Sequence, residues 1–151
     1  MTVHHSTFTI ERRYPASVDR VFHAWSDADA KQSWFACHDD WRTENYALEF
    51  RPGGRERADT YPSDGGVAHK YLALYYDIVP NERIVYSYEM HLGETRISVS
   101  LATVTFAQHD DETELTFTEQ VVMLDEYDDA AGREEGTRAG LDNLGRILNA
   151  A

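Results

Sequence analysis

The chain has 151 residues, 42% of them hydrophobic, which is enough for one domain with a single buried core. Its formal net charge of −13 repels phosphate groups, so we expect no nucleic-acid partner and no membrane association. Cys37 is the single cysteine and excludes an internal disulfide. With no signal-peptide pattern or membrane-length apolar run, these features predict a soluble, cytoplasmic protein.

The first third of the chain predicts one strand followed by two short helices. Thr7–Tyr14 has strand composition and ends at Pro15. Ser17 is a suitable N-cap for a helix over Val18–Trp25, whose apolar residues recur at helical spacing. A second helix is expected to begin at Asp27 or Asp29 and to end near Phe35.

Residues 41–124 alternate apolar and polar side chains in the manner of consecutive strands. The expected strands are Trp41–Arg51, Arg55–Tyr61, Val67–Val79, Arg83–Leu92, Thr95–Ala107 and Glu112–Leu124. The polar strand Arg55–Tyr61 is expected at an edge or rim, and a change of apolar phase predicts a bulge near Leu101. Eight side chains are expected to face the inside of the sheet: Leu72, Leu74, Tyr76, Ile78, Ile84, Tyr86, Tyr88 and Met90.

The C-terminal residues, about Ala130–Ala151, predict one long helix. Its buried stripe is expected to consist of Leu141, Leu144 and Leu148. Gly132, Gly136 and Gly140 recur every four residues on one side, and each costs a helix about 1 kcal/mol relative to alanine. Two compensations are possible: close approach of the helix backbone to the sheet, or space kept for a ligand.

An apolar sheet face covered by a single helix predicts an α+β fold shaped like a cup, formed by one domain over residues 1–151. Several segments carry a resemblance to known proteins. They are FTIERRYPASVDRVFHAWSD at 8–27, WFA at 34–36, LEFRPGG at 48–54, IVPNERIVYSY at 78–88, TVTFAQHDDETELTFTEQ at 103–120 and GTRAGLDNLGRIL at 136–148. With these motifs the chain resembles the heat shock protein 90 ATPase activator-like family of the SRPBCC (START-like, birch-pollen-allergen-like) superfamily.

This resemblance implies a helix-grip fold, in which a curved antiparallel sheet with two short helices after strand 1 wraps a long C-terminal helix. It also implies a cavity between sheet and helix. Superfamily members include lipid and hormone carriers, polyketide cyclases and co-chaperone domains, and no shared catalytic set carries over to this chain. Where the family often has tryptophan, this chain has Thr137, which implies a larger or more polar cavity.

Glu119 is the candidate polar residue of the cavity, because it continues the inward phase of Leu115 and Phe117. An inward, unpaired carboxylate costs several kcal/mol or becomes protonated, and could orient a ligand or act as a general acid or base. The alternative is a carboxylate at the rim, hydrated or paired with an arginine. The tyrosines have two interpretations as well: hydroxyls presented to a ligand, or core filling.

The sequence contains no metal, cofactor or nucleophile signature that withstands inspection. The seven histidines lack metal-ligand spacing, and the cluster of His38, Asp39 and Asp40 is too local to converge on one ion. Cys37 beside His38 is interpreted as a small buried side chain. Trp34, Phe35 and Trp41 are interpreted as core residues first and as a gate at the mouth second. We therefore expect no cofactor and no metal.

The leading hypothesis is a non-enzymatic protein that binds a small apolar or aromatic molecule between the sheet and the C-terminal helix. The alternatives are a co-chaperone-like domain that docks on a larger chaperone, and an enzyme of cyclase or hydrolase type that uses Glu119. The candidate ligand-binding residues are Trp34, Tyr76, Tyr86, Tyr88, Phe106, Phe117, Glu119, Val121, Thr137, Gly140, Leu141 and Leu144.

Overall fold

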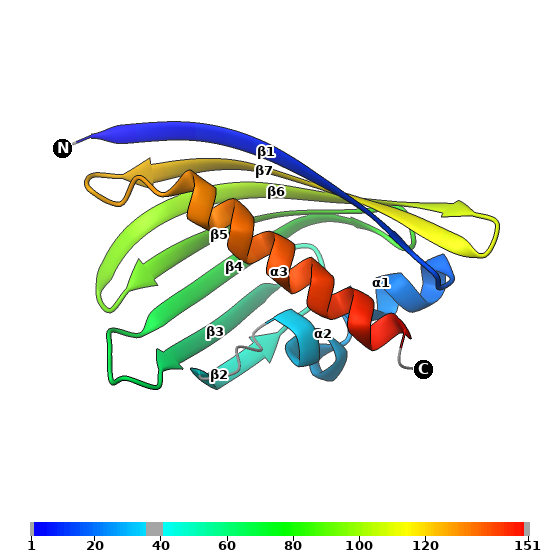
Figure 1. Cartoon of the computed structure of the whole chain (residues 1–151), viewed down its shortest axis with the longest axis horizontal. Coiled ribbons are helices and arrows are strands. Elements are labelled where there is room, and N and C mark those ends of the chain that lie inside the picture. The colour runs from blue at the N-terminus through cyan, green and yellow to red at the C-terminus, as the bar shows by residue number, and fades with distance from the viewer. Residues whose placement is uncertain (1, 36–40, 150–151) are drawn as a thin grey trace.

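A computed structural model describes residues 2–35 and 41–149. Seven antiparallel strands form one curved sheet in the order β1-β7-β6-β5-β4-β3-β2, and the longest helix crosses its concave face (Figure 1). The elements are β1 (Val3–Tyr14), α1 (Val18–Ser26), α2 (Ala28–Phe35), β2 (Trp41–Leu48), β3 (Arg55–Pro62), β4 (His69–Val79), β5 (Arg83–Leu92), β6 (Thr95–His109), β7 (Glu112–Leu124) and α3 (Ala130–Asn149). The α+β helix-grip architecture is thereby confirmed.

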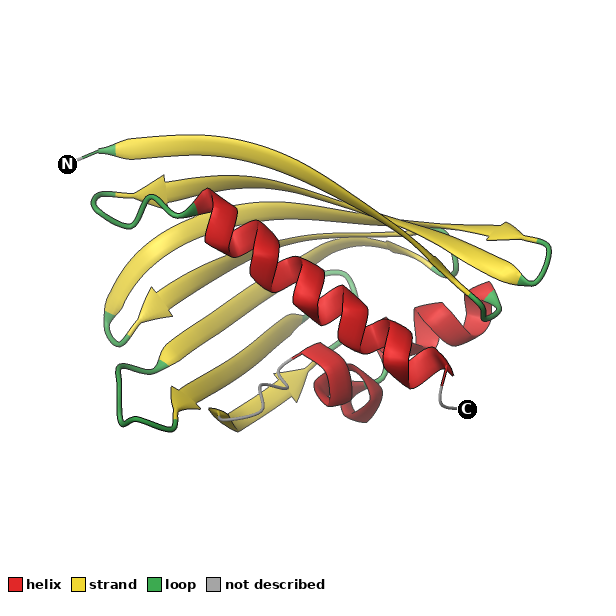
Figure 2. Ribbon diagram, viewed as in Figure 1, coloured by secondary structure: helices red, strands yellow, loops and turns green. Residues whose placement is uncertain are grey.

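The caps of the two short helices follow the sequence pattern. The Ser17 side chain accepts a hydrogen bond from the backbone N–H of Arg20 at 3.4 Å, which starts α1. Oδ2 of Asp27 accepts from the N–H of Ala30 at 3.0 Å, so Asp27 and not Asp29 caps α2. Both helices lie near the C-terminal end of α3 and close that end of the sheet (Figure 2).

The inward phase of β4 differs from the prediction. The β4 side chains that face the core are Tyr71, Ala73 and Tyr75. Leu72 and Tyr76 lie on the outer face with exposed fractions of 41% and 55%, and Leu74 shares their phase. The pairing passes from Tyr75↔Tyr86 to Asp77↔Val85, which leaves Tyr76 as the extra residue of a bulge. The inward placement of Leu72, Leu74 and Tyr76 was therefore wrong, because the phase of Ile78 does not extend back through this bulge.

Two further expectations about the sheet were wrong. The register of β5 and β6 shifts between Met90↔Ser98 and His91↔Arg96, so the bulge of β6 lies at Ile97 instead of Leu101. Val99 and Leu101 simply lie on the outer face. The strand β3 pairs with both β2 and β4, and β2 forms the edge.

Helix α3 is seated mainly through its C-terminal half. Its buried residues are Leu141, Leu144 and Leu148. The hydroxyl of Tyr14 on β1 donates to the carbonyl oxygen of Leu141 at 2.8 Å, and a Cβ on Gly145 would lie 3.4 Å from the Tyr14 ring. Before Leu141, no side chain of α3 is fully buried, although Arg133 is largely covered, and this half of the helix leaves space between itself and the sheet. No helix in the described part of the chain is both long and apolar enough to span a membrane.

Candidate ligand-binding site

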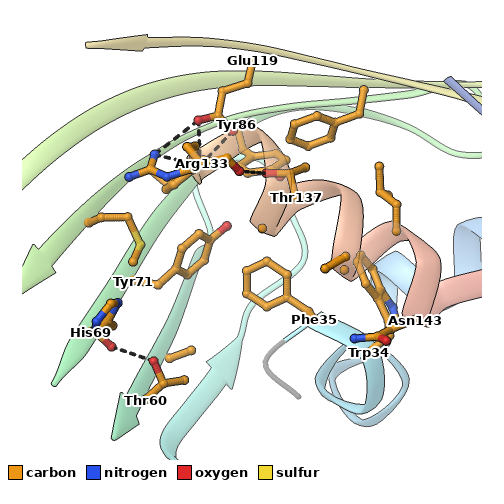
Figure 3. Close-up of a pocket in the computed structure, with 18 of the residues that line it drawn as sticks. Trp34, Phe35, Thr60, His69, Tyr71, Tyr86, Glu119, Arg133, Thr137 and Asn143 are labelled. Carbon is orange, nitrogen blue, oxygen red and sulfur yellow. Dashed lines mark hydrogen bonds and ion pairs between the residues drawn. The ribbon is translucent and has the colours of Figure 1, made fainter. Parts of the chain in front are cut away.

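A cavity of about 270 Å³ lies between the inner face of the sheet and α3 (Figure 3). Its wall is largely aromatic, and the side chains of Phe35 and Tyr71 point into the space that faces Thr137 on α3. Thr60, His69 and Asn143 line it as well. The aromatic residues of the wall are Trp25, Trp34, Phe35, Tyr71, Tyr86, Tyr88 and Phe117.

The helix side of the cavity contains several small residues, three of them glycines. Gly136 and Gly140 line it, and a Cβ built on either one would meet no atom within 4 Å. Of the two compensations considered for these glycines, the structure therefore has open space and not close backbone approach. Gly132 differs, because a Cβ there would collide with the carboxylate of Asp129, which accepts a hydrogen bond from the Gly132 N–H at 3.0 Å.

One end of the cavity is closed by a polar cluster around Glu119, whose side chain has no exposed surface. The two carboxylate oxygens accept from the Tyr88 hydroxyl at 2.8 and 2.7 Å, and Oε2 also accepts from Ser100 Oγ at 2.8 Å. Nη1 of Arg133 lies 3.3 Å from Oε2. Glu119 thus points inward, as its strand phase predicted, and it has a cationic partner on α3.

Arg133 links α3 to the sheet through this cluster. Its Nη1 also donates to the Tyr88 hydroxyl at 3.2 Å, and its Nη2 donates to Ser98 Oγ at 2.7 Å. Burial alone would lower the pKa of the guanidinium, but Tyr88 and Glu119 together raise that pKa above its ordinary value. Burial, followed by the charge of Glu119, raises the pKa of the Tyr88 phenol well above 10. Arg133 is therefore a permanent cation and Tyr88 a permanent donor.

A second buried ion pair lies behind the aromatic wall. Nζ of Lys31 on α2 lies 2.7 Å from Oε1 of Glu56 on β3, and both side chains are fully buried. The hydroxyls of Tyr75 and Tyr46 each donate to Glu56 at 2.7 Å. With a longer bond of 3.5 Å from the Tyr71 hydroxyl, the carboxylate accepts four hydrogen bonds, which tie α2, β2, β3 and β4 together.

Aromatic rings surround the ammonium group of Lys31. Its Nζ lies 4.5 Å from the ring centroid of Phe35, 5.3 Å from that of Trp25 and 5.5 Å from that of Tyr86. These three rings also line the cavity. Burial lowers the pKa of Lys31, while the charge of Glu56 and its hydrogen bond oppose that shift. The buried pair thus packs directly against rings that form the cavity wall.

The structure brings most of the expected site residues together. Those that line the cavity are Trp34, Tyr86, Tyr88, Phe117, Glu119, Thr137, Gly140 and Leu141. Phe106 instead packs against Phe22 and Trp25 beneath α1, and Val121 and Leu144 are buried core residues away from the cavity lining. Tyr76 lies on the outer face because of the bulge in β4, so its assignment to the cavity is corrected.

Sequence reasoning missed the charged partners Arg133, Lys31 and Glu56. Arg133 stands four residues before Thr137 and eight before Leu141, so helical spacing could have placed it on the inner face. Lys31 stands three residues before the buried Trp34, and Glu56 stands two residues before the buried Ala58. A charged residue in the phase of buried neighbours is the signal that these three positions share.

The loop cluster of His38, Asp39 and Asp40 lies outside the described residues, and so does Cys37, for which a small buried side chain was predicted. Within residues 2–35 and 41–149, no group of three or more histidine, cysteine or acidic side chains is arranged to hold a metal ion.

A curved antiparallel sheet that wraps a long C-terminal helix around a cavity defines a helix-grip protein. The chain belongs to the Activator of Hsp90 ATPase homolog 1-like family, which it matches over residues 15–149, and thus to the SRPBCC superfamily. No curated protein matches the chain.

Several solved structures are similar to the chain. An uncharacterized protein from Rhizobium leguminosarum is 52% identical, with 99% of this chain and 98% of that chain covered and a TM-score of 0.95. A protein from Rhizobium loti is 44% identical over 97% of this chain and 99% of that chain, with a TM-score of 0.89. An AHSA1-like protein from Aeromonas hydrophila, at 22% identity, 96% and 93% coverage and a TM-score of 0.74, shares the fold.

Proposed function

We propose that this protein binds one small apolar or aromatic molecule in the cavity between the concave face of the sheet and α3. The observation that carries the proposal is the open space beside Gly136 and Gly140, opposite an aromatic wall. Two glycines in a helix interior cost about 1 kcal/mol each relative to alanine, and room for a bound molecule accounts for that cost. Removing apolar surface from water supplies affinity at about 25 cal/mol per Å².

The cluster of Glu119, Tyr88 and Arg133 supports an orienting role for the polar end and not an acid–base role. A general acid or base must exchange its proton with a substrate, but both oxygens of Glu119 already accept hydrogen bonds inside the protein. We accordingly propose a binding protein that uses no cofactor, and we place it in the cytoplasm.

A titration panel of fatty acids, flavonoids and aromatic polyketides, monitored by amide NMR shifts, tests the proposal. We expect saturable shifts at residues of the wall, such as Trp34, Tyr71 and Thr137. Shifts confined to the outer face, around Tyr76 and Leu101, would contradict a ligand in the cavity.

A second candidate function, docking on a heat shock protein 90 type chaperone, is favoured by apolar side chains on the outer face. Leu72 and Tyr76 of β4 and Val99 and Leu101 of β6 are exposed, and these two strands flank β5 on either side. Exposed apolar residues that share one face of a sheet occur at many protein interfaces. The variants Tyr76→Asp and Leu101→Asp would abolish binding to the purified chaperone, and unchanged binding by both would remove this candidate.

A further inference from the structure

The charges of the cavity are balanced within the cavity itself. Among the residues that the structure describes, the carboxylate and guanidinium groups that line it are those of Glu119 and Arg133, and they lie 3.3 Å apart. His69 also lines the cavity, on β4. A ligand carboxylate would therefore lie near the negative charge of Glu119, while the positive charge of Arg133 is already neutralised by Glu119. A ligand ammonium would meet the guanidinium of Arg133 in the same way.

The cluster of Glu119, Tyr88 and Arg133 still has a hydrogen-bond donor to offer to a ligand. Arg133 has five N–H donors, and its hydrogen bonds to Tyr88, Ser100, Glu119 and Ser98 come from Nη1 and Nη2. Its Nε–H has no hydrogen-bond partner in residues 2–35 and 41–149. Glu119, by contrast, is already supplied with donors by Tyr88, Ser100 and Arg133. The group that complements this cluster is an uncharged oxygen acceptor.

The size and lining of the cavity restrict the rest of the ligand. A volume of about 270 Å³ lies just below the range of ~300–1,000 Å³ typical of pockets for drug-sized ligands. It is therefore suited to one or two rings and not to a long or branched lipid. The rings of Phe35, Tyr71 and Tyr88 offer faces and edges against which a flat molecule stacks.

We infer that the cavity selects small uncharged aromatic molecules that carry one hydrogen-bond-accepting oxygen, such as an aryl ketone, held against Arg133. This inference rests on the proposed function and narrows it to one chemical class. It assigns Glu119 the role of a charge filter, because its carboxylate neutralises Arg133 and excludes organic acids.

Four naphthalenes of similar shape test the inference by calorimetric titration of the full chain: acetylnaphthalene, isopropylnaphthalene, naphthoate and naphthylmethylammonium. We expect the ketone to bind at least about tenfold more tightly than each of the other three, a difference of about 1.4 kcal/mol. In Glu119→Gln, which leaves the charge of Arg133 uncompensated, we expect naphthoate to become the preferred probe. The matched control is Glu135→Gln, which removes an exposed glutamate of α3 and is expected to keep the wild-type order.

The outcomes separate the inference from the proposed function. Naphthoate or naphthylmethylammonium binding to the wild type as tightly as the ketone would overturn the inference and leave cavity binding in place. Equal binding of the ketone and isopropylnaphthalene would overturn it too. Failure of all four probes to bind would overturn both. If Glu119→Gln does not fold, the wild-type order alone decides.

Discussion

The ammonium nitrogen of Lys31 lies 2.7 Å from Oε1 of Glu56, and neither side chain has exposed surface. The pair joins a short helix to a strand near the edge of the sheet, directly behind the rings that line the cavity. Buried pairs of this kind are sensitive to loss of one partner, because the other is then left as an uncompensated charge.

Lys31→Met and Glu56→Gln are each expected to lower the free energy of unfolding by about 3–5 kcal/mol. The double variant Lys31→Met/Glu56→Leu is expected to recover most of that loss, because it leaves no charge behind. Urea unfolding followed by circular dichroism measures all three. Single variants as stable as the wild type would show that the pair is not buried in solution.

Gly136→Ala and Gly140→Ala are each expected to raise the free energy of unfolding by up to about 1 kcal/mol, since an added Cβ meets open space and helix propensity improves. Gly132→Ala is the contrast. Its Cβ would displace the Asp129 carboxylate from the helix N-terminus, and loss of that cap, about 1 kcal/mol, offsets the gain in helix propensity, so we expect no net stabilisation. Thermal unfolding of the three variants distinguishes them; destabilisation by Gly136→Ala and Gly140→Ala would mean that α3 lies closer to the sheet than described.

Arg133 joins the sparsely buried half of α3 to the sheet, so Arg133→Met is expected to increase amide hydrogen exchange in residues 130–140. Residues 141–149 are expected to change less, because Leu141, Leu144 and Leu148 remain buried. Arg138→Met is the matched control, because Arg138 pairs with Glu134 on the helix itself at 2.7 Å. Equal exchange in the two variants would rule out a special role for Arg133 in holding α3.

Six of the nine tyrosines have a raised pKa, and burial is the main cause for each: Tyr14, Tyr46, Tyr71, Tyr75, Tyr86 and Tyr88. Above about pH 10 the unfolded chain releases these phenolic protons while the folded chain keeps them. Their contribution to stability is therefore complete below about pH 10 and declines above it, by about 1.4 kcal/mol per pH unit for each tyrosine. Tyrosinate absorbance should rise abruptly at alkaline unfolding; gradual ionisation of all nine with the fold intact would contradict the described burial.

The strands β5 and β7 could be predicted with their bounds, because their apolar phase runs without interruption into turns marked by Pro80, Asn81 and the acidic pair 110–111. The β4 phase could not, because the bulge at Tyr76 leaves no mark in an alternation where both Tyr75 and Tyr76 are aromatic. Local patterning does not specify which of two neighbouring apolar residues is the inserted one.

Part of the candidate site could be predicted from strand alternation alone. Glu119 was found because it follows Leu115 and Phe117 in alternation. Arg133 and Lys31 were not, because a long cation on a helix is ordinarily solvent-exposed and its burial depends on a carboxylate far away in the chain. Glu56 shares the strand phase of Ala58, but only the tertiary structure shows that it pairs with Lys31.

The most direct measurement of ligand binding in the cavity compares acetylnaphthalene titrations of the wild type, Gly140→Phe and Glu135→Phe by amide NMR. Gly140→Phe places a ring into the open space, whereas Glu135→Phe places the same ring on an exposed position of α3. The expected result is saturable shifts at Trp34, Tyr71 and Thr137 in the wild type and in Glu135→Phe, and their loss in Gly140→Phe. Undiminished shifts in Gly140→Phe, or no binding by the wild type, would contradict a ligand held between the sheet and α3.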